Sequence, residues 1–163
     1  KPGLALRPER PDDEELIFRI FVASKALEFD GMPMPQFQKD FLLKQQHVSQ
    51  LYNWRHTYPS LEQWIIECGG EPVGRLIFSN LPDQIILHDL AMLPGRLGVG
   101  GGRIVIKDVI FAEAVRCGKI ARASVAAYNP ARRLYARLGV TELPPHPPGS
   151  PMIPLQWTPP ALR

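Results

Sequence analysis

The chain has 163 residues and a mass of 18.3 kDa, a length that suits one domain with a sizeable hydrophobic core. Hydrophobic residues make up 45% and charged residues 21%, as is typical of soluble globular proteins. No apolar run is long enough for a membrane span, or for a secretory signal near Lys1. We therefore expect a cytoplasmic protein without a membrane partner.

The charged, cysteine and histidine residues exclude further classes. The net charge of +3 favours an anionic ligand but is too small to indicate nucleic acid. Cys68 and Cys117 lack the spacing of a zinc site or a disulfide framework, and the four histidines contain no His-x-x-x-His pair. We therefore expect no metal and no nucleic-acid partner.

The first sixty residues predict a strand and two helices. Leu4–Arg7 alternates weakly as a strand, and Asp12 with Glu15 predicts the capped start of a helix. The apolar residues of that helix keep helical spacing at Leu16, Ile17, Ile20, Phe21 and Leu27. A second helix ends at Tyr58-Pro59, and its expected apolar side holds Phe37, Phe41, Val48, Leu51 and Tyr52.

The rest of the chain predicts strands and helices separated by Gly and Pro residues. In chain order these are strands Trp64–Glu67, Val73–Ser79 and Ile85–Leu93, a helix over 102–116, a strand Ile120–Ala126, a helix Asn129–Leu138 and a strand Met152–Trp157. The helix over 102–116 makes a crossover, so the strands on either side of it should pair in parallel. The prediction is an α/β fold with a mixed sheet and helices on both faces.

Glycines gather in the run Leu93–Gly102, between a predicted strand and a predicted helix. Such a run lets backbone N–H groups converge on an anion at a helix N-terminus. Arg103 stands where the dinucleotide fingerprint needs its third glycine, and the Gly-Lys-Ser/Thr of a Walker loop is absent. The run therefore predicts a phosphate site of another kind, and a glycine-rich turn without a ligand is the alternative.

A second motif spans Asn129–Gly139 and reads Asn-Pro-Ala-Arg-Arg-Leu-Tyr-Ala-Arg-Leu-Gly. Asn129 is a good N-cap, and Pro130 fits the first helical position. Tyr135 falls on the apolar face of this helix. Taken alone, that position indicates a core residue whose hydroxyl finds a partner.

Together the two segments resemble the GCN5-related N-acetyltransferase (GNAT) superfamily over residues 4–143. Ile86–Pro94 resembles the family's fourth strand, residues 98–102 its pyrophosphate loop, and Asn129–Gly139 its Asn-Pro-Ala-x-x-Leu-Tyr-x-x-Leu-Gly segment. The resemblance implies a single domain over 1–163 with a twisted mixed sheet of six to seven strands. Residues 144–163, where eight of the 18 prolines lie, would form a proline-rich loop and the closing strand.

The sequence departs from the family pattern in two places. The usual loop is Arg/Gln-x-x-Gly-x-Gly/Ala. Counted from Arg96, the fourth position is Val99, whereas counting from Gly95 satisfies both glycines but loses the leading Arg/Gln. Val140 also replaces the common aromatic residue after Leu-Gly.

The resemblance implies direct transfer of the acetyl group from acetyl-CoA, as cosubstrate, to a primary amine of a small molecule or a protein. It places acetyl-CoA on the fourth strand, on the glycine loop and at the cap of the next helix. The implied binding residues are Leu90, Ala91, Met92, Arg96, Gly98, Val99, Gly100, Gly101, Gly102 and Asn129.

Three residues are candidates for the proton transfers of this reaction. Tyr135 matches the family position that gives a proton to the leaving thiolate. His88 and Asp89 are candidate bases, but neighbours on a strand point to opposite faces, so at most one of them faces the acyl group. Hydrogen bonding at the strand end is the alternative role for each, and Tyr52 and His56 are candidates for the acceptor pocket.

Two other functions remain open. A non-catalytic acyl-CoA-binding sensor or partner module would use the same cofactor residues, and a nucleotide-phosphate enzyme would use the same glycine run. The sequence does not identify the amine acceptor, because this fold places many acceptors over one cofactor site. The proline-rich end is also compatible with a homodimer.

Overall fold

The structure is a computed structural model, and it describes residues 3–95 and 101–163. Within these residues, seven strands form one sheet in a mixed α/β fold. In spatial order the strands are β1 (Leu4–Pro8), β2 (Leu61–Cys68), β3 (Glu71–Asn80), β4 (Gln84–Met92), β5 (Ile120–Ala126), β7 (Met152–Trp157) and β6 (Thr141–Glu142). The predicted mixed sheet is confirmed.

The helical elements alternate with these strands along the chain. They are η1 (Pro11–Asp13), α1 (Glu14–Ser24), α2 (Ala26–Phe29), α3 (Gln36–Thr57), α4 (Gly101–Val105), η2 (Ile106–Phe111), α5 (Ala112–Cys117), α6 (Ala131–Arg137) and η3 (Pro160–Leu162). Segment η2 has π-helical hydrogen bonding and continues directly from α4 into α5. The sequence prediction did not contain this π-helical segment, the short helix α2 or the strand β6.

The chain divides into two compact units. Unit 1 comprises Lys1–Ile77 and Asp89–Val99, and unit 2 comprises Phe78–His88 and Gly100–Arg163. The division passes through β3 after Ile77 and through β4 after His88. A single domain over the whole chain stays a prediction.

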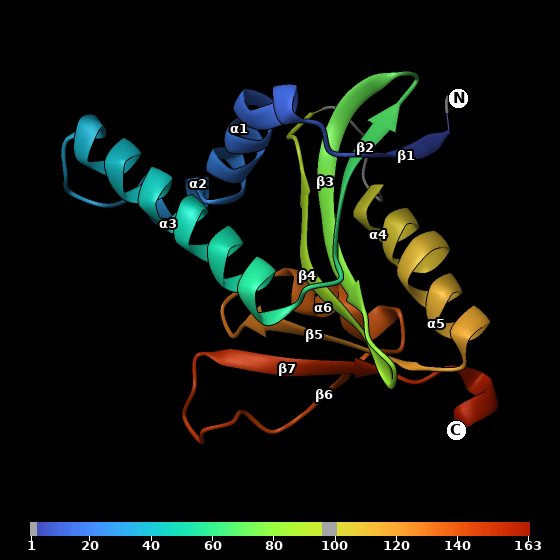
Figure 1. The fold of residues 1–163 in the computed structure, drawn as a ribbon. Coiled ribbons are helices and arrows are strands. Elements are labelled where there is room, and N and C mark those ends of the chain that lie inside the picture. The colour runs from blue at the N-terminus through green and yellow to red at the C-terminus, as the bar shows by residue number, and fades with distance from the viewer. Residues whose placement is uncertain (1–2, 96–100) are drawn as a thin grey trace. The chain divides into compact units, whose positions relative to one another are not determined.

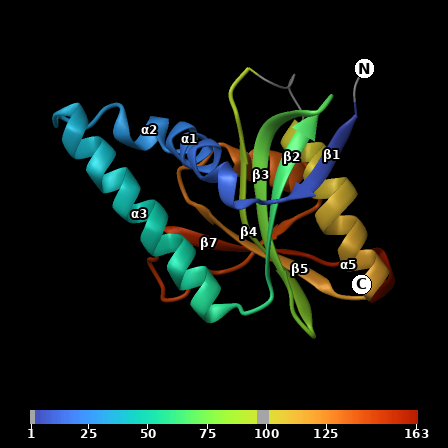
Figure 2. The ribbon, with the colours of Figure 1, turned by 45° about the horizontal axis from the view of Figure 1, so that its top comes forward.

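Unit 1 joins antiparallel strands to the helices α1, α2 and α3, which Figure 2 shows in succession. Strands β1 and β2 pair antiparallel, with Leu6 opposite Ile66. Phe21, Phe29 and Leu43 form one buried cluster that ties α1, α2 and α3 together. Burial of these apolar side chains holds the long helix α3 in place.

Helix α1 starts differently from the sequence prediction. The chain makes the short turn η1 first, and α1 begins at Glu14. The backbone N–H of Arg10 donates to Oδ2 of Asp13 at 2.8 Å. The side chain that accepts a backbone hydrogen bond before α1 is therefore that of Asp13, not that of Asp12. Asp13 is buried and also accepts two hydrogen bonds from Arg7, each at 2.8 Å. The predicted capping by Asp12 was wrong.

The predicted apolar side of α3 was also wrong. Phe37, Phe41, Val48 and Tyr52 have between 56% and 71% of their surface exposed. The buried residues of α3 are Leu43 and His47 instead. Apolar residues occur on more than one side of this helix, so their spacing alone did not identify the packed side.

Unit 2 contains the parallel pair of the sheet. Gln84 of β4 pairs with Ile120 of β5 in parallel, and the helical stretch from α4 to α5 lies between these strands in the sequence, as predicted. Figure 1 shows β5 beside β7, which pair antiparallel with Ala123 opposite Leu155. Strand β7 has the predicted bounds, Met152–Trp157, and covers its buried side with Ile153 and Leu155.

Candidate functional site

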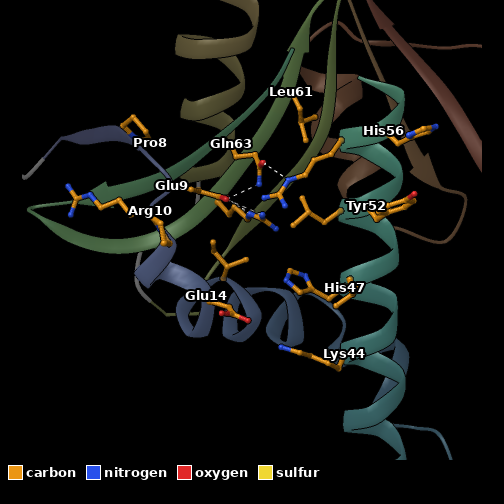
Figure 3. Close-up of a pocket in the computed structure, with 16 residues that line it drawn as sticks. Pro8, Glu9, Arg10, Glu14, Lys44, His47, Tyr52, His56, Leu61 and Gln63 are labelled. Carbon is orange, nitrogen blue, oxygen red and sulfur yellow. Dashed lines mark hydrogen bonds and ion pairs between the residues drawn. The ribbon is translucent and has the colours of Figure 1, made fainter. Parts of the chain in front are cut away.

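A pocket of about 1030 Å³ opens in unit 1 beside α3 (Figure 3). It lies among the end of β1, the start of α1, the strands β2 and β3, and the second half of α3. Its polar and charged lining residues are Glu9, Arg10, Glu14, Lys44, His47, Tyr52, Arg55, His56, Gln63 and Arg75. The sequence analysis identified only two of these, Tyr52 and His56.

A chain of hydrogen bonds crosses the pocket wall from β3 to α3 (Figure 3). Arg75 donates from Nε to Oε1 of Glu9 and from Nη2 to Oε2 at 3.3 Å. Gln63 Nε2 donates to Oε2 of Glu9 at 2.9 Å, and Arg55 Nε donates to Oε1 of Gln63 at 3.2 Å. Arg75 is 3% exposed, and a charge buried to that degree requires the carboxylate that it has.

His47 enters the pocket from α3 as a buried imidazole (Figure 3). Its ring centroid lies 4.9 Å from that of Phe21 and 5.8 Å from that of Phe18. Burial lowers the pKa of His47, and the charges of Arg75, Lys44 and Arg55 lower it further. The imidazole is therefore neutral at pH 7 and lies where several positive charges act together.

Tyr52 and His56 border the same pocket but turn their rings away from it in Figure 3. Their rings are stacked, with centroids 6.0 Å apart and an interplanar angle of 3°. Tyr52 is 67% exposed. Lys44, His47 and Arg55 are the other polar residues of α3 that line the pocket, and we call the side of the helix that carries them its inner side.

The second half of β4 in unit 1 carries four predicted site residues. Asp89, Leu90 and Met92 are half-buried, and Ala91 is buried. Burial raises the pKa of Asp89, while the charges of Arg75 and Lys25 oppose that rise. The charge of Glu9, a residue of the pocket wall, adds to the rise in this pKa.

Four of the predicted loop residues, Arg96, Gly98, Val99 and Gly100, lie outside the described residues. In unit 2, Gly101 is buried and Gly102 half-buried at the start of α4. Their part in binding a diphosphate stays a prediction.

His88, in the first half of β4 and in unit 2, is held by a hydrogen bond. Its Nε2 lies 2.8 Å from Oγ of the buried Ser79. Burial lowers the pKa of His88 to about 4, so the imidazole is neutral at pH 7. The bond to Ser79 agrees with the alternative role of His88 in strand hydrogen bonding.

Asn129 and Tyr135 lie at the start and in the middle of the α6 segment of unit 2. The backbone N–H of Ala131 donates to Oδ1 of Asn129 at 2.9 Å, the bond expected of a capping side chain, but α6 begins at Ala131 and Pro130 takes the N-cap position. Tyr135 is half-buried and packs against Val125, Ile153 and Leu155. These contacts agree with the core alternative for Tyr135, and its proton-donating role stays a prediction.

Tyr135 also borders a small apolar cavity of about 20 Å³, the size of one water molecule. Phe111 and Trp157 line this cavity, and their stacked rings have centroids 3.9 Å apart. Phe111 is the last residue of the π-helical segment η2, and such segments frequently occur at functional sites.

Residues 3–95 and 101–163 contain no group of three or more His, Cys, Asp or Glu that could hold a metal ion. None of the described helices has both the length and the apolar character that a bilayer crossing requires.

Residues 27–140 match the family model of the acetyltransferase (GNAT) family. A comparison of the sequence with curated proteins gives no match. The matched residues 27–140 contain strand β4, the glycine run and the Asn129–Gly139 segment, which carry the resemblance seen in the sequence.

Solved structures of acetyltransferases share the fold. The PaiA N-acetyltransferase of Thermoplasma acidophilum in complex with coenzyme A has 11% identity and a TM-score of 0.68, with 96% of this chain and 99% of that chain covered. An acetyltransferase of Thermus thermophilus has 22% identity and a TM-score of 0.65, covering 95% and 96%. The N-acetyltransferase PseH of Campylobacter jejuni in complex with acetyl coenzyme A has 17% identity and a TM-score of 0.60, covering 96% and 99%.

Proposed function

Because the chain belongs to the GNAT family of N-acetyltransferases, we propose that it transfers the acetyl group of acetyl-CoA to a primary amine of a small molecule or a protein. The observation that carries this proposal is the family match over residues 27–140. It includes β4, the glycine run and the Asn129–Gly139 segment in one continuous stretch.

The chemistry defines what the protein must supply. The amine nitrogen attacks the thioester carbonyl carbon, so a C–N bond forms and the C–S bond breaks. The sulfur leaves with its electron pair and takes a proton, and the nitrogen loses one. The amine must be neutral before it attacks, and the oxygen that gains charge needs a hydrogen-bond donor such as a backbone N–H.

We assign these tasks to residues of β4 and α6. Leu90, Ala91 and Met92 bind the cosubstrate along β4, together with the glycine run and Asn129. Tyr135 supplies a hydrogen bond or a proton to the leaving thiolate. Because the ordinary pKa of about 10 for a tyrosine lies above the value of about 8.5 for a thiol, the hydroxyl is protonated before the reaction, and the proton that the amine loses restores it afterwards. Asp89 is the better of the two candidate bases, because burial raises its pKa and so brings it closer to the pKa of the amine that it must deprotonate.

Replacement of Tyr135 by Phe tests the assignment of the acid. The variant keeps the ring that packs on Val125, Ile153 and Leu155 and loses only the hydroxyl. We expect kcat to fall by about 10²-fold or more, as is usual when a general acid is removed, while the KM for acetyl-CoA changes little. The measurement is CoA thiol release with a panel of primary amines.

Tyr128→Phe is the matched control, because Tyr128 is 76% exposed and lies outside both cavities. Its kcat should equal that of the wild type. An unchanged kcat in Tyr135→Phe, under conditions where chemistry limits the rate, would remove Tyr135 from the mechanism.

An acyl-CoA-binding module is the second candidate function. The packing of Tyr135 against aliphatic residues favours it, because a core tyrosine needs no catalytic role. This function predicts that acetyl-CoA raises the melting temperature but is not consumed with any amine.

A further inference from the structure

The inner side of α3 presents two positive side chains and one imidazole to the unit 1 pocket. Lys44, His47 and Arg55 stand at positions i, i+3 and i+11 of the helix, which places them along one side. Figure 3 shows Lys44 and His47 extending from α3 into the pocket. Both Lys44 and Arg55 are exposed, so a ligand in the pocket can reach them.

The carboxylate nearest to these groups is already neutralised. Glu9 accepts two hydrogen bonds from Arg75 and one from Gln63. Arg55, in contrast, donates to the neutral amide of Gln63. Lys44 lies over the ring of Phe18, with Nζ 4.8 Å from the centroid. Among the residues that the structure describes, neither Lys44 nor Arg55 has a carboxylate partner.

The positive charges act at one place. Because Arg75 and Glu9 form an ion pair, the charged groups of the described lining that have no such partner are Lys44 and Arg55 on α3, with the carboxylate of Glu14 on α1 opposite in sign. Figure 3 shows Arg10, another lining cation, directed away from the pocket. A cationic ligand would therefore meet net repulsion here, whereas an anionic oxygen group would meet two hydrogen-bond donors of opposite charge.

We propose that the amine acceptor carries an anionic oxygen group, a carboxylate or a phosphate, and that Lys44 and Arg55 bind this group in the unit 1 pocket. This inference rests on the proposed acetyl transfer. The pocket and the second half of β4, with the candidate base Asp89, belong to the same compact unit of the chain. Polyamines and other acceptors with only positive charge are disfavoured.

Matched pairs of amines test the proposal. L-Phenylalanine is compared with L-phenylalaninamide, and O-phosphoethanolamine with ethanolamine, because the members of each pair differ in whether they carry the anion. We expect a kcat/KM about tenfold higher or more for the anionic member of at least one pair. The pair that responds distinguishes a carboxylate from a phosphate.

Variants of Arg55 then locate the contact. Arg55→Gln should raise the KM for the anionic amine about tenfold, leave kcat within about twofold, and leave the KM for the member of the pair without the anion unchanged. Arg55→Lys should recover part of the loss, because it keeps the charge. Arg19→Gln is the control, since Arg19 is an exposed arginine of α1 that does not line the pocket.

Two outcomes overturn the inference. One is acetyl transfer that favours the amide and ethanolamine, and the other is an equal KM for the anionic amine in wild type and Arg55→Gln. If no amine is acetylated, the proposed function fails by itself, and anion binding is measured directly. Inorganic phosphate or acetate should then raise the melting temperature of the wild type more than that of Arg55→Gln, and equal shifts would overturn the anion site.

Discussion

Burial shifts the pKa values of two adjacent residues, His88 and Asp89, in opposite directions. The charged form of each loses contact with water, so the pKa of the imidazole falls and that of the carboxyl rises. His88 accordingly stays neutral and bonded to Ser79, whereas Asp89 becomes a stronger base than an exposed aspartate. This difference favours Asp89 for proton transfer and His88 for holding the strand.

The low pKa of His88 predicts a loss of stability in acid. Its pKa is about 4 in the folded state and 6.5 in the unfolded state, so the unfolded chain binds the proton first as the pH falls. The free energy of unfolding should therefore decrease by about 2 kcal/mol between pH 6.5 and pH 4, and this contribution levels off below pH 4.

Chemical denaturation of wild type and His88→Gln across this pH range measures the effect. The difference between their free energies of unfolding should narrow as the pH falls, because the variant has no proton to take up at position 88. His146→Gln, which removes an exposed imidazole, is the control. Parallel curves for wild type and His88→Gln would contradict the assigned pKa.

At the scale of elements, β3 and the end of β4 approach each other through a glycine. The backbone N–H of Leu93 donates to the carbonyl of Val73 at 2.7 Å. A Cβ on Gly74 would lie 2.6 Å from the carbonyl oxygen of Ala91 and 2.8 Å from Sδ of Met92. Both of these residues belong to the predicted acetyl-CoA strand, so glycine at position 74 helps to set the position of that strand.

Gly74→Ala should therefore destabilise the protein by about 1–3 kcal/mol, because the backbone of β4 must move to admit a methyl group. Urea denaturation measures the loss. Gly31→Ala is the control, since a Cβ there has nothing within 4 Å. If Gly74→Ala proves as stable as the wild type, the close approach of the two strands is wrong.

The elements themselves were largely predictable. The strand Met152–Trp157 and the parallel crossover follow from apolar runs and from the glycines around them. The start of α1 was not predictable in the same way, because Asp12 and Asp13 are both acceptable caps by sequence. Their roles separate only when Arg7 is placed against Asp13.

For the whole molecule, the family and the segments that carry its motifs were visible in the sequence, but the pocket was not. Motifs identify β4 and Asn129–Gly139 because their residues are close together in the chain. Glu9 and Arg75 are 66 residues apart, and Glu9 and Gln63 are 54 apart, so only the fold brings them together. On α3, aromatic residues such as Phe37 and Phe41 are exposed, so the pattern of apolar residues did not identify the buried side that carries His47.

Transfer of an isotopically labelled acetyl group tests the central claim of acetyltransferase activity most directly. The purified chain is incubated with acetyl-CoA labelled in its acetyl group and with the panel of primary amines, and products are followed by mass spectrometry together with CoA thiol release. The account predicts a labelled N-acetyl product formed in equal amount to the free thiol. Binding of acetyl-CoA without any labelled amine, or thiol release accompanied only by labelled acetate, would contradict it.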